Sequence, residues 1–592
     1  MLKLSLLFAS LILALVSSSA AAGSEADTRF EELAARFVDA WPALSPVGAT
    51  QLGDHRFDGQ LDQISPAARK QEVAFYREYF QLLAPIPREQ LSRANQIDAE
   101  LLRHHLEAGL WNLEVLEEWA WNPLVSTNLA GGAIYGLMAR EFAPLDQRLV
   151  DVSSRLEQLP RFFEQVRATL DPARVPDIHA ETAVRQNRGM LSILDNMVRP
   201  AMGSLAPGDR ERLERAMATA RAAVAEQQSW LESRLLPRAK GDFRIGADRF
   251  DAKLAFTLHT PLTRAQVRER AETEFRRVRD EMYEVATTVY AEHYPYAEFP
   301  EPPSESYRQA IIRAALEVAY EQLPGRNEIV DTAKRLLERT TAFVREKDLV
   351  TVPDDPIEVI IMPEFQRGVT VAYCDSPGAL DVGQKTFYAV APLPEDWTPE
   401  QVRSFLREYN ELSLEDLTIH EAMPGHYLQL AHSNRYPSTL RAVLSSGPFI
   451  EGWAVYAERV MIDQGYLDGD PLMRLINLKW YLRAVTNAIL DQAIHVDGMT
   501  RDEAMKLMIE GAFQEEREAA GKWVRAQLTA TQLSTYFVGY QELADLRREY
   551  EGRAGEGFDL KTYHDELLSY GSPPVQFVRA LLLELPVPRS GS

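Results

Sequence analysis

Apolar residues recur at three- and four-residue spacing along most of this 592-residue chain. The pattern covers residues 30–41, 67–83, 88–116 and 207–235, and a more charged form of it continues through 263–293 and 306–345. Such spacing places apolar side chains on one face of an α-helix, which then packs against other helices. Ser65, Thr398 and Thr500 stand where a side chain can cap a first turn. We therefore expect a mainly α fold.

One stretch departs from the helical pattern. Residues 357–362, 369–372 and 386–391 are short and rich in β-branched or aromatic side chains, with Pro, Gly and Asp between them. These features predict two to four strands that form a small sheet. The expected order is therefore a long run of helices, a small β insert and then more helices.

The first 22 residues are typical of a secretory signal peptide. Lys3 provides a positive start, residues 4–16 are apolar apart from two serines, and small residues follow up to Ala22. The alternative is an uncleaved anchor, but the apolar core is shorter than the roughly 20 residues that span a membrane. The only cysteine is Cys374, so none follows the signal as a site for lipid attachment. We expect an exported protein, periplasmic or secreted, without a stable membrane anchor.

The charge balance argues against nucleic-acid binding, and the cysteine content excludes disulfide bonds within the chain. The chain has 64 Lys plus Arg against 87 Asp plus Glu, a net charge of −23. Nucleic acid is an unlikely partner, because phosphate contacts need local positive charge. A single cysteine permits no internal disulfide, so stability has to come from a large core.

The segment at residues 413–432, SLEDLTIHEAMPGHYLQLAH, has the composition of a metal site. Ser413 can cap a helix that carries His420, Glu421 and His426. In a zincin motif two histidines at i and i+4 bind zinc and the Glu is the general base. Here the second histidine is at i+6, which on a regular helix lies roughly 120° from the first. The intervening Pro424 and Gly425 favour a distorted turn or bulge that would bring His426 back toward His420.

A second segment, GPFIEGWAVYAERVMID at 447–463, places two carboxylates on one helix face. Glu451 and Glu458 are seven residues apart, and burying them without partners would be costly. One metal ligand and one carboxylate that orients a ligating histidine would account for the pair. The alternative is a structural network of buried His–Glu or Glu–Arg contacts.

The two segments resemble a known family. HEAMPGHYLQ at 420–429 and EGWAVYAERVM at 451–461 are similar to the two central motifs of the bacterial domain-of-unknown-function family 885, which is grouped with the gluzincin metallopeptidases. Weaker similarity at 46–61, 482–504 and 534–547 extends the resemblance over the whole mature chain. It implies a large helical body with a deep cleft and a small sheet near one Zn²⁺ ion.

The resemblance also implies roles for single residues. His420, His426 and Glu451 become the zinc ligands, Glu421 the catalytic base, and Glu458 a partner that orients a ligating histidine. Related peptidases place a tyrosine from a late helix at the oxyanion, and the candidates here are Tyr536 and Tyr540.

Other residues are weaker candidates. Asp491 and His495 are four apart on one predicted helix, where they either orient a ligand or form a structural pair. The strand from Val369 to Tyr373 could pair with an extended peptide substrate, or be an ordinary strand of the sheet. Arg483 is a candidate for a substrate carboxylate. Cys374 is expected to be a spectator thiol, since no histidine partner is evident.

We therefore expect a signal peptide at 1–22 and one domain at 23–592, in which 23–345 wall a cleft and 346–592 hold the zinc site. The expected function is an exported zinc metallopeptidase that acts on short peptides. The alternatives are a zinc hydrolase or amidase with a non-peptide substrate and a peptide-binding protein without turnover. An intact Glu421 argues against a pure binding protein.

Overall fold

Helices begin where the sequence offers a capping side chain. In the computed structural model, which describes residues 24–363 and 371–589, Ser65 accepts a hydrogen bond from the backbone N–H of Ala68. Thr398 and Thr500 both form complete capping boxes. The predicted signal peptide and Val369 lie outside the described residues.

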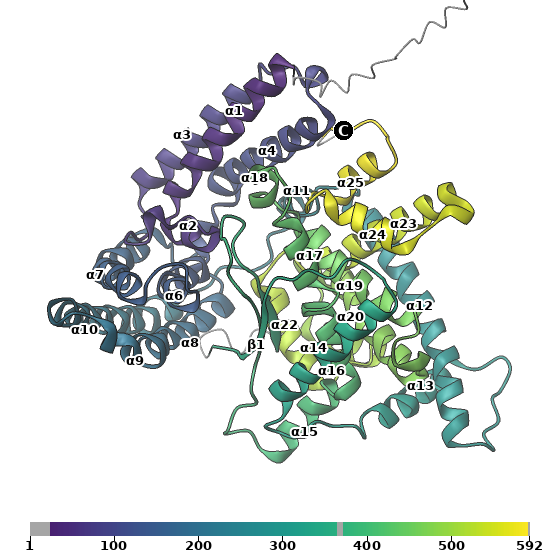
Figure 1. The fold of residues 1–592 in the computed structure, drawn as a ribbon. Coiled ribbons are helices and arrows are strands. Elements are labelled where there is room, and N and C mark those ends of the chain that lie inside the picture. Colours follow the sequence, from purple (N-terminus) through teal and green to yellow (C-terminus); the bar gives the residue numbers. More distant parts are fainter. Residues whose placement is uncertain (1–23, 364–370, 590–592) are drawn as a thin grey trace, which may run out of the picture.

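Among the described residues, the part of the chain from residue 24 to 238 is helical apart from its turns and loops. Its helices are α1 (Glu25–Ala40), α2 (Pro46–Leu52), α3 (Pro66–Leu83), α4 (Arg93–Trp111), α5 (Glu118–Trp121), α6 (Pro123–Ala139), α7 (Leu145–Thr169), α8 (Asp177–Ile193), α9 (Arg199–Ala201) and α10 (Pro207–Trp230). α1, α3 and α4 form one layer, and α6, α7, α8 and α10 form a bundle beside it (Figure 1). Each group has its own hydrophobic cluster.

The remaining helices precede and follow the small sheet along the chain. They are α11 (Ala247–Leu258), α12 (Arg264–His293), α13 (Glu305–Ala319), α14 (Ile329–Glu346), α15 (Pro399–Glu408), α16 (Glu411–Glu421), α17 (His426–Ser433), α18 (Thr439–Val443), α19 (Gly447–Asp463), α20 (Pro471–His495), α21 (Arg501–Lys506), α22 (Glu516–Leu528), α23 (Ser534–Ala554), α24 (Leu560–Ser569) and α25 (Val575–Leu582). The largest hydrophobic cluster runs from Phe250 to Leu583 and so joins helices on both sides of residue 345. The division at 345 stays a prediction.

The predicted β insert is a three-stranded sheet in the order β1–β3–β2. Its strands are β1 (Ile357–Ile361), β2 (Ala372–Asp375) and β3 (Thr386–Val390). β3 is parallel to β1 and antiparallel to β2, so β2 is an edge strand, and it packs against α16. The mainly α fold with a small sheet is thus confirmed.

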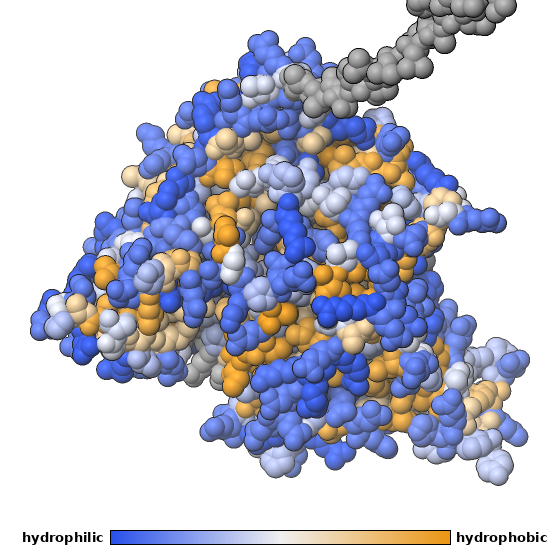
Figure 2. Space-filling model, viewed as in Figure 1, coloured by the Kyte–Doolittle hydropathy of each residue, from blue (hydrophilic) through white to orange (hydrophobic). Residues whose placement is uncertain are grey.

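The surface agrees with a helical protein that buries its apolar faces. Figure 2 shows hydrophilic side chains over most of one face, with hydrophobic ones gathered in patches along its middle. Among the helices of the described residues, none combines the length and the apolar character needed to cross a membrane.

Candidate metal centre

A break between two helices brings His420 and His426 together. α16 ends at Glu421 and α17 begins at His426, and the Met423–Pro424 peptide bond between them is cis. The two imidazole ring centroids are 4.7 Å apart. The distorted turn expected from Pro424 and Gly425 is therefore present, and it divides the predicted helix into two.

Gly425 is required by a close approach inside this turn. Its N–H donates to the carbonyl of Ile419, and a Cβ atom at this position would lie 1.9 Å from the carbonyl oxygen of His420. Trp453 of α19 donates from its indole nitrogen to the carbonyl of Pro424 at 2.9 Å. The turn is thus closed by backbone contact and anchored to the helix that carries Glu451.

The start of α16 differs from the prediction. Its capping residue is Asn410, whose side chain accepts a hydrogen bond from the N–H of Ser413, so Ser413 lies inside the helix. Asn410, three residues before Ser413, is therefore the N-cap residue of α16. Asp416 also lies inside the helix, where its side chain is next to Glu458.

Three side chains from α16, α17 and α19 converge on one point. Ligand atoms of His420, His426 and Glu451 all lie within 4.8 Å of one another. An oxygen of Glu451 is 3.7 Å from Nε2 of His420 and 3.5 Å from Nε2 of His426. Two ligands bound to zinc at about 2.1 Å in tetrahedral geometry are about 3.4 Å apart. The donor set and its spacing therefore fit a zinc ion held by two histidines and one carboxylate.

The electrostatics of the three residues favour a cation between them. Burial alone would lower the pKa of His420, but its contacts with Glu451 and Glu458 raise that pKa well above the usual range. Burial would raise the pKa of Glu451, yet both histidines hold it well below the usual range. In the metal-free protein a proton satisfies this arrangement, and a divalent cation would replace it.

Glu458 orients His420 from the side opposite Glu451. Its carboxylate lies 2.5 Å from Nδ1 of His420, which leaves Nε2 directed at Glu451. Asp416 lies beside Glu458, and burial next to that carboxylate raises the pKa of Asp416 well above its usual range. The sequence interpretation overlooked Asp416. Its spacing of four residues before His420 on one helix was the available signal.

Glu421 faces a small cavity next to the histidines. The cavity has a volume of about 120 Å³, and its lining includes His420, Glu421, Glu458, Ala372, Trp480, Arg483, Asn487, Lys522, Arg525 and Tyr536. Among the described residues, no hydrogen-bond partner is found for the Glu421 carboxylate. A carboxylate without a structural partner, next to candidate metal ligands, has the position of a general base.

The two candidate tyrosines differ in position. Tyr536 lines the cavity, and its ring centroid is 6.5 Å from that of His420. Its hydroxyl oxygen accepts hydrogen bonds from Arg525 at 2.8 Å and Gln532 at 3.3 Å. Tyr540 packs instead against Tyr481, with ring centroids 4.5 Å apart, and does not line this cavity. The geometry selects Tyr536 over Tyr540, which lies one helical turn further along α23.

A close crossing of α19 and α23 places Tyr536. Gly452 and Gly539 meet there, and a Cβ atom on Gly452 would be 2.3 Å from the backbone of Gly539. Two helices can approach this closely only where both lack a side chain. The contact sets α23 directly against the helix that carries Glu451.

Arg483 lines the cavity but is already paired. Its guanidinium lies 2.5 Å from a carboxylate oxygen of Glu518 and 3.4 Å from one of Glu408. Lys522 and Arg525 of α22 also line the cavity, and the sequence interpretation overlooked both. Nothing in the sequence distinguishes them among 64 Lys and Arg residues.

Asp491 and His495 lie away from the metal ligands, so the assignment as their orienting partners is not supported. Asp491 accepts hydrogen bonds from the N–H groups of Thr531, in the turn before α23, and Ser534, the first residue of α23. His495 contacts the carbonyls of Ala526 and Thr529 at the end of α22. Both residues hold the turn between these helices, which agrees with the structural alternative.

The strand predicted to meet a substrate borders the cavity at its start. Val371 and Ala372 line it, whereas Tyr373 points to Tyr135 of α6 and hydrogen bonds with it. Cys374 contacts the hydroxyl of Ser376 at 3.4 Å, and burial raises the pKa of its thiol. The thiol is therefore protonated and not a nucleophile.

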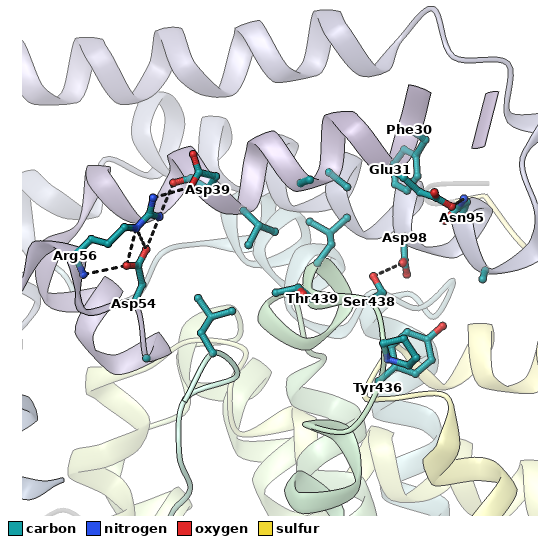
Figure 3. Close-up of a pocket in the computed structure, with 18 of the residues that line it drawn as sticks. Phe30, Glu31, Asp39, Asp54, Arg56, Asn95, Asp98, Tyr436, Ser438 and Thr439 are labelled. Atoms are coloured by element: carbon teal, nitrogen blue, oxygen red, sulfur yellow. Dashed lines mark hydrogen bonds and ion pairs between the residues drawn. The ribbon is translucent and has the colours of Figure 1, made fainter. Parts of the chain in front are cut away.

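A larger cavity of about 1010 Å³ lies elsewhere, between α1, α4 and the segment before α18. Figure 3 shows that its charged groups pair with one another: Arg56 bridges Asp39 and Asp54, and Ser438 donates to Asp98. It lacks a convergence of ligating side chains like that at His420, so the metal centre is the better functional candidate.

Comparison with known proteins finds matches that extend over most of the chain. A family model described as a bacterial protein of unknown function (DUF885) matches residues 46–582. A solved structure from Shewanella oneidensis, provisionally described as a lipoprotein of unknown function, is 34% identical with a TM-score of 0.78, over 94% of this chain and 99% of that one. A second, from Colwellia psychrerythraea and also provisionally described as a lipoprotein, is 17% identical with a TM-score of 0.77, over 95% and 99%, and shares the fold. A search of curated proteins gives no match.

Proposed function

The chain belongs to the DUF885 family of bacterial proteins, and from this premise we propose that it is an exported zinc-dependent peptidase that hydrolyses short peptides. The observation that carries the proposal is the convergence of His420, His426 and Glu451 within 4.8 Å beside the carboxylate of Glu421. Two histidines and a carboxylate form the ligand set of several zinc peptidases, and such sites keep one position open.

The residues around the ligands have separate roles in the proposed hydrolysis. When bound, zinc supplies a Lewis acid that polarises a peptide carbonyl and makes water acidic near neutral pH. Glu421 takes the proton of the attacking water at its carboxylate and delivers it to the leaving amine nitrogen. Tyr536 directs its hydroxyl proton away from Arg525 and Gln532, which both donate to its oxygen, and stabilises the developing oxyanion.

The proposed place of action is outside the cytoplasm, in the periplasm or the medium. The predicted signal peptide and the description of both solved relatives as lipoproteins support export.

The test combines metal analysis with an assay of peptide turnover. The purified protein is assayed for bound zinc and incubated with a library of short peptides, with products identified by mass spectrometry. We expect one zinc per chain, cleavage that stops with a chelator, and recovery on adding zinc. Glu421→Gln should keep zinc and lose turnover, whereas Glu411→Gln, at the exposed start of the same helix, should keep both.

The alternatives give different outcomes in the same assay. Hydrolysis of non-peptide amides or esters with intact peptides would favour the zinc hydrolase or amidase. Peptide binding without products would favour the binding protein, whereas full turnover by the Glu421→Gln variant would contradict the proposed role of Glu421. Absence of zinc after purification and reconstitution would contradict the proposal itself.

A further inference from the structure

The cavity beside the metal centre has a cationic side that the proposed hydrolysis does not use. α16 supplies His420 and Glu421 to its lining and α19 supplies Glu458, while α20 and α22 supply Arg483, Lys522 and Arg525. These helices enclose one cavity, so a molecule within reach of Glu421 is also within reach of the three cations.

The carboxylates nearby are committed to other cations. Glu408 lies 2.8 Å from the ammonium of Lys479 and 3.4 Å from Arg483. Glu518 lies 2.5 Å from Arg483 and accepts a hydrogen bond from the hydroxyl of Tyr409. Glu408 and Glu518 thus neutralise Lys479 and Arg483. Neither carboxylate is in contact with Lys522 or Arg525.

Lys522 is a buried cation without a partner. Its residue is 7% exposed and lines the cavity. Among the described residues, no carboxylate lies within 4.0 Å of its ammonium and no group forms a hydrogen bond with it. Arg525 donates only to the neutral groups of Tyr536 and Gln532. A buried charge of this kind is costly unless an anion neutralises it.

The protonation of Lys522 reflects this imbalance. Burial lowers the pKa of its ammonium to about 7, and repulsion from Arg483 and Arg525 acts in the same direction, against a weaker attraction by Glu518 and Glu408. A carboxylate that enters the cavity would favour the charged form of the ammonium and raise its pKa. The site therefore favours an anionic ligand group over a neutral one.

We infer that Lys522, with Arg525 beside it, binds the C-terminal carboxylate of a peptide, which makes the protein a carboxypeptidase. This inference rests on the proposed peptidase function. Water adds across the last peptide bond: its oxygen joins the carbonyl carbon, a proton goes to the leaving nitrogen, and a shortened peptide and one free amino acid result.

The size of the cavity supports release of a single residue. Its volume is about 120 Å³. Pockets for drug-sized ligands span about 300–1,000 Å³, and a cavity of about 150 Å³ holds one benzene molecule. The cavity thus has room for about one residue beyond the scissile bond. The terminal carboxylate of that residue would then contact Lys522.

The first experiment needs no variant. The zinc-loaded full-length protein is assayed on matched peptides that end in a free carboxylate or in a C-terminal amide. We expect removal of the last residue from the free acid and a kcat/KM at least about 100-fold lower for the amide, because the amide leaves Lys522 unpaired. Equal cleavage of both, or internal cleavage, would overturn the inference and leave the peptidase proposal intact.

A third peptide tests whether the recognised carboxylate is that of the chain terminus or that of an acidic side chain. It ends in an amide but carries glutamate as its last residue. Poor cleavage of this peptide supports recognition of the chain terminus. Cleavage as fast as that of the free acid would overturn the inference in favour of an acidic side chain.

The variant Lys522→Met tests the residue. We expect its kcat/KM on the free acid to fall about 100-fold and its activity on the amide to stay within about threefold, so that the preference disappears. Lys506→Met, at the exposed end of α21, is the matched control and should retain the preference. A Lys522→Met variant that still prefers the free acid would contradict the assignment.

A binding measurement separates this inference from the proposed function. Zinc-loaded Glu421→Gln protein is titrated calorimetrically with the free acid and the amide. Stronger binding of the acid, lost on adding Lys522→Met, supports the carboxylate subsite even if the wild-type protein hydrolyses no peptide. Equal binding of acid and amide would count against the subsite whatever the turnover.

Discussion

The Nδ1 atom of His420 lies 2.5 Å from a carboxylate oxygen of Glu458. On α19, Glu458 follows Glu451 by two helical turns. One face of α19 therefore presents both a candidate metal ligand and the carboxylate that orients another ligand. The hydrogen bond fixes the tautomer of His420, so that Nε2 is the atom available to the ion. Asp416 lies next to Glu458 and interacts with its carboxylate.

Removing the charge of Glu458 should weaken zinc binding. The change Glu458→Gln leaves a hydrogen-bond acceptor but lowers the basicity of His420. We expect the Kd for zinc to rise about 10- to 100-fold, as measured by competition with a chromogenic chelator. Asp463→Asn, on the same helix but half-exposed, should leave the Kd unchanged. Unchanged affinity in the Glu458→Gln variant would show that the contact is not coupled to the metal.

The residues that come together at the centre could be predicted because their signals are local. The adjacent His420 and Glu421, the Pro–Gly pair before His426 and the seven-residue interval from Glu451 to Glu458 each appear within one short segment. Helical geometry then predicts which of them share a face. The mainly α fold follows from the same local periodicity.

The cationic side of the cavity could not be predicted in this way. Lys522 lies about 100 residues from His420 in the chain, and its lack of a carboxylate partner depends on how Glu408 and Glu518 pair with other cations. Likewise, the choice of Tyr536 over Tyr540 depends on the crossing of α19 and α23. Such facts arise from tertiary packing, to which a single sequence gives no direct access.

The substitution Gly425→Ala should disrupt the turn that joins the two histidines. Its new Cβ atom would lie 1.9 Å from the carbonyl oxygen of His420, which belongs to the backbone and cannot move aside cheaply. We expect a loss of about 1–3 kcal/mol in the free energy of unfolding and weaker zinc binding, measured by chemical denaturation and metal titration.

Gly447→Ala is the matched control for that variant. Gly447 begins α19, and no heavy atom of the described residues lies within 4 Å of a Cβ atom placed there. Its stability should be equal to that of the wild type or slightly higher, since alanine favours helix. Equal stability and zinc affinity of both variants would mean that the turn tolerates a side chain.

The two tyrosines of α23 should differ in their kinetic effect. If Tyr536 donates to the oxyanion, Tyr536→Phe lowers kcat about 10²- to 10³-fold with little change in KM, because the donor acts mainly in the transition state. Tyr540→Phe should stay within about threefold of the wild type, since Tyr540 packs against Tyr481. The measurement is steady-state kinetics on a peptide substrate. Equal effects at the two positions would remove Tyr536 from the mechanism.

Acid should destabilise the protein partly through His564 of α24. This histidine is 2% exposed, donates from Nδ1 to the carbonyl of Leu349 and accepts at Nε2 from Tyr456. Burial lowers its pKa to about 4, compared with about 6.5 in the unfolded chain. Between these values the unfolded chain binds the additional proton, so stability falls as the pH drops from about 6.5 to about 4, by about 3 kcal/mol from this group.

The substitution His564→Asn isolates this contribution. Unfolding of metal-free protein is measured at pH 7 and pH 4.5 for the wild type, His564→Asn and His293→Asn, which changes an exposed histidine at the end of α12. The histidines of the metal centre are common to all three proteins, so their titration cancels in the comparison. The wild type and His293→Asn should lose more stability on acidification than His564→Asn, because only the last has lost the buried group that takes up a proton on unfolding. Identical losses in all three would show that His564 is not held neutral by the fold.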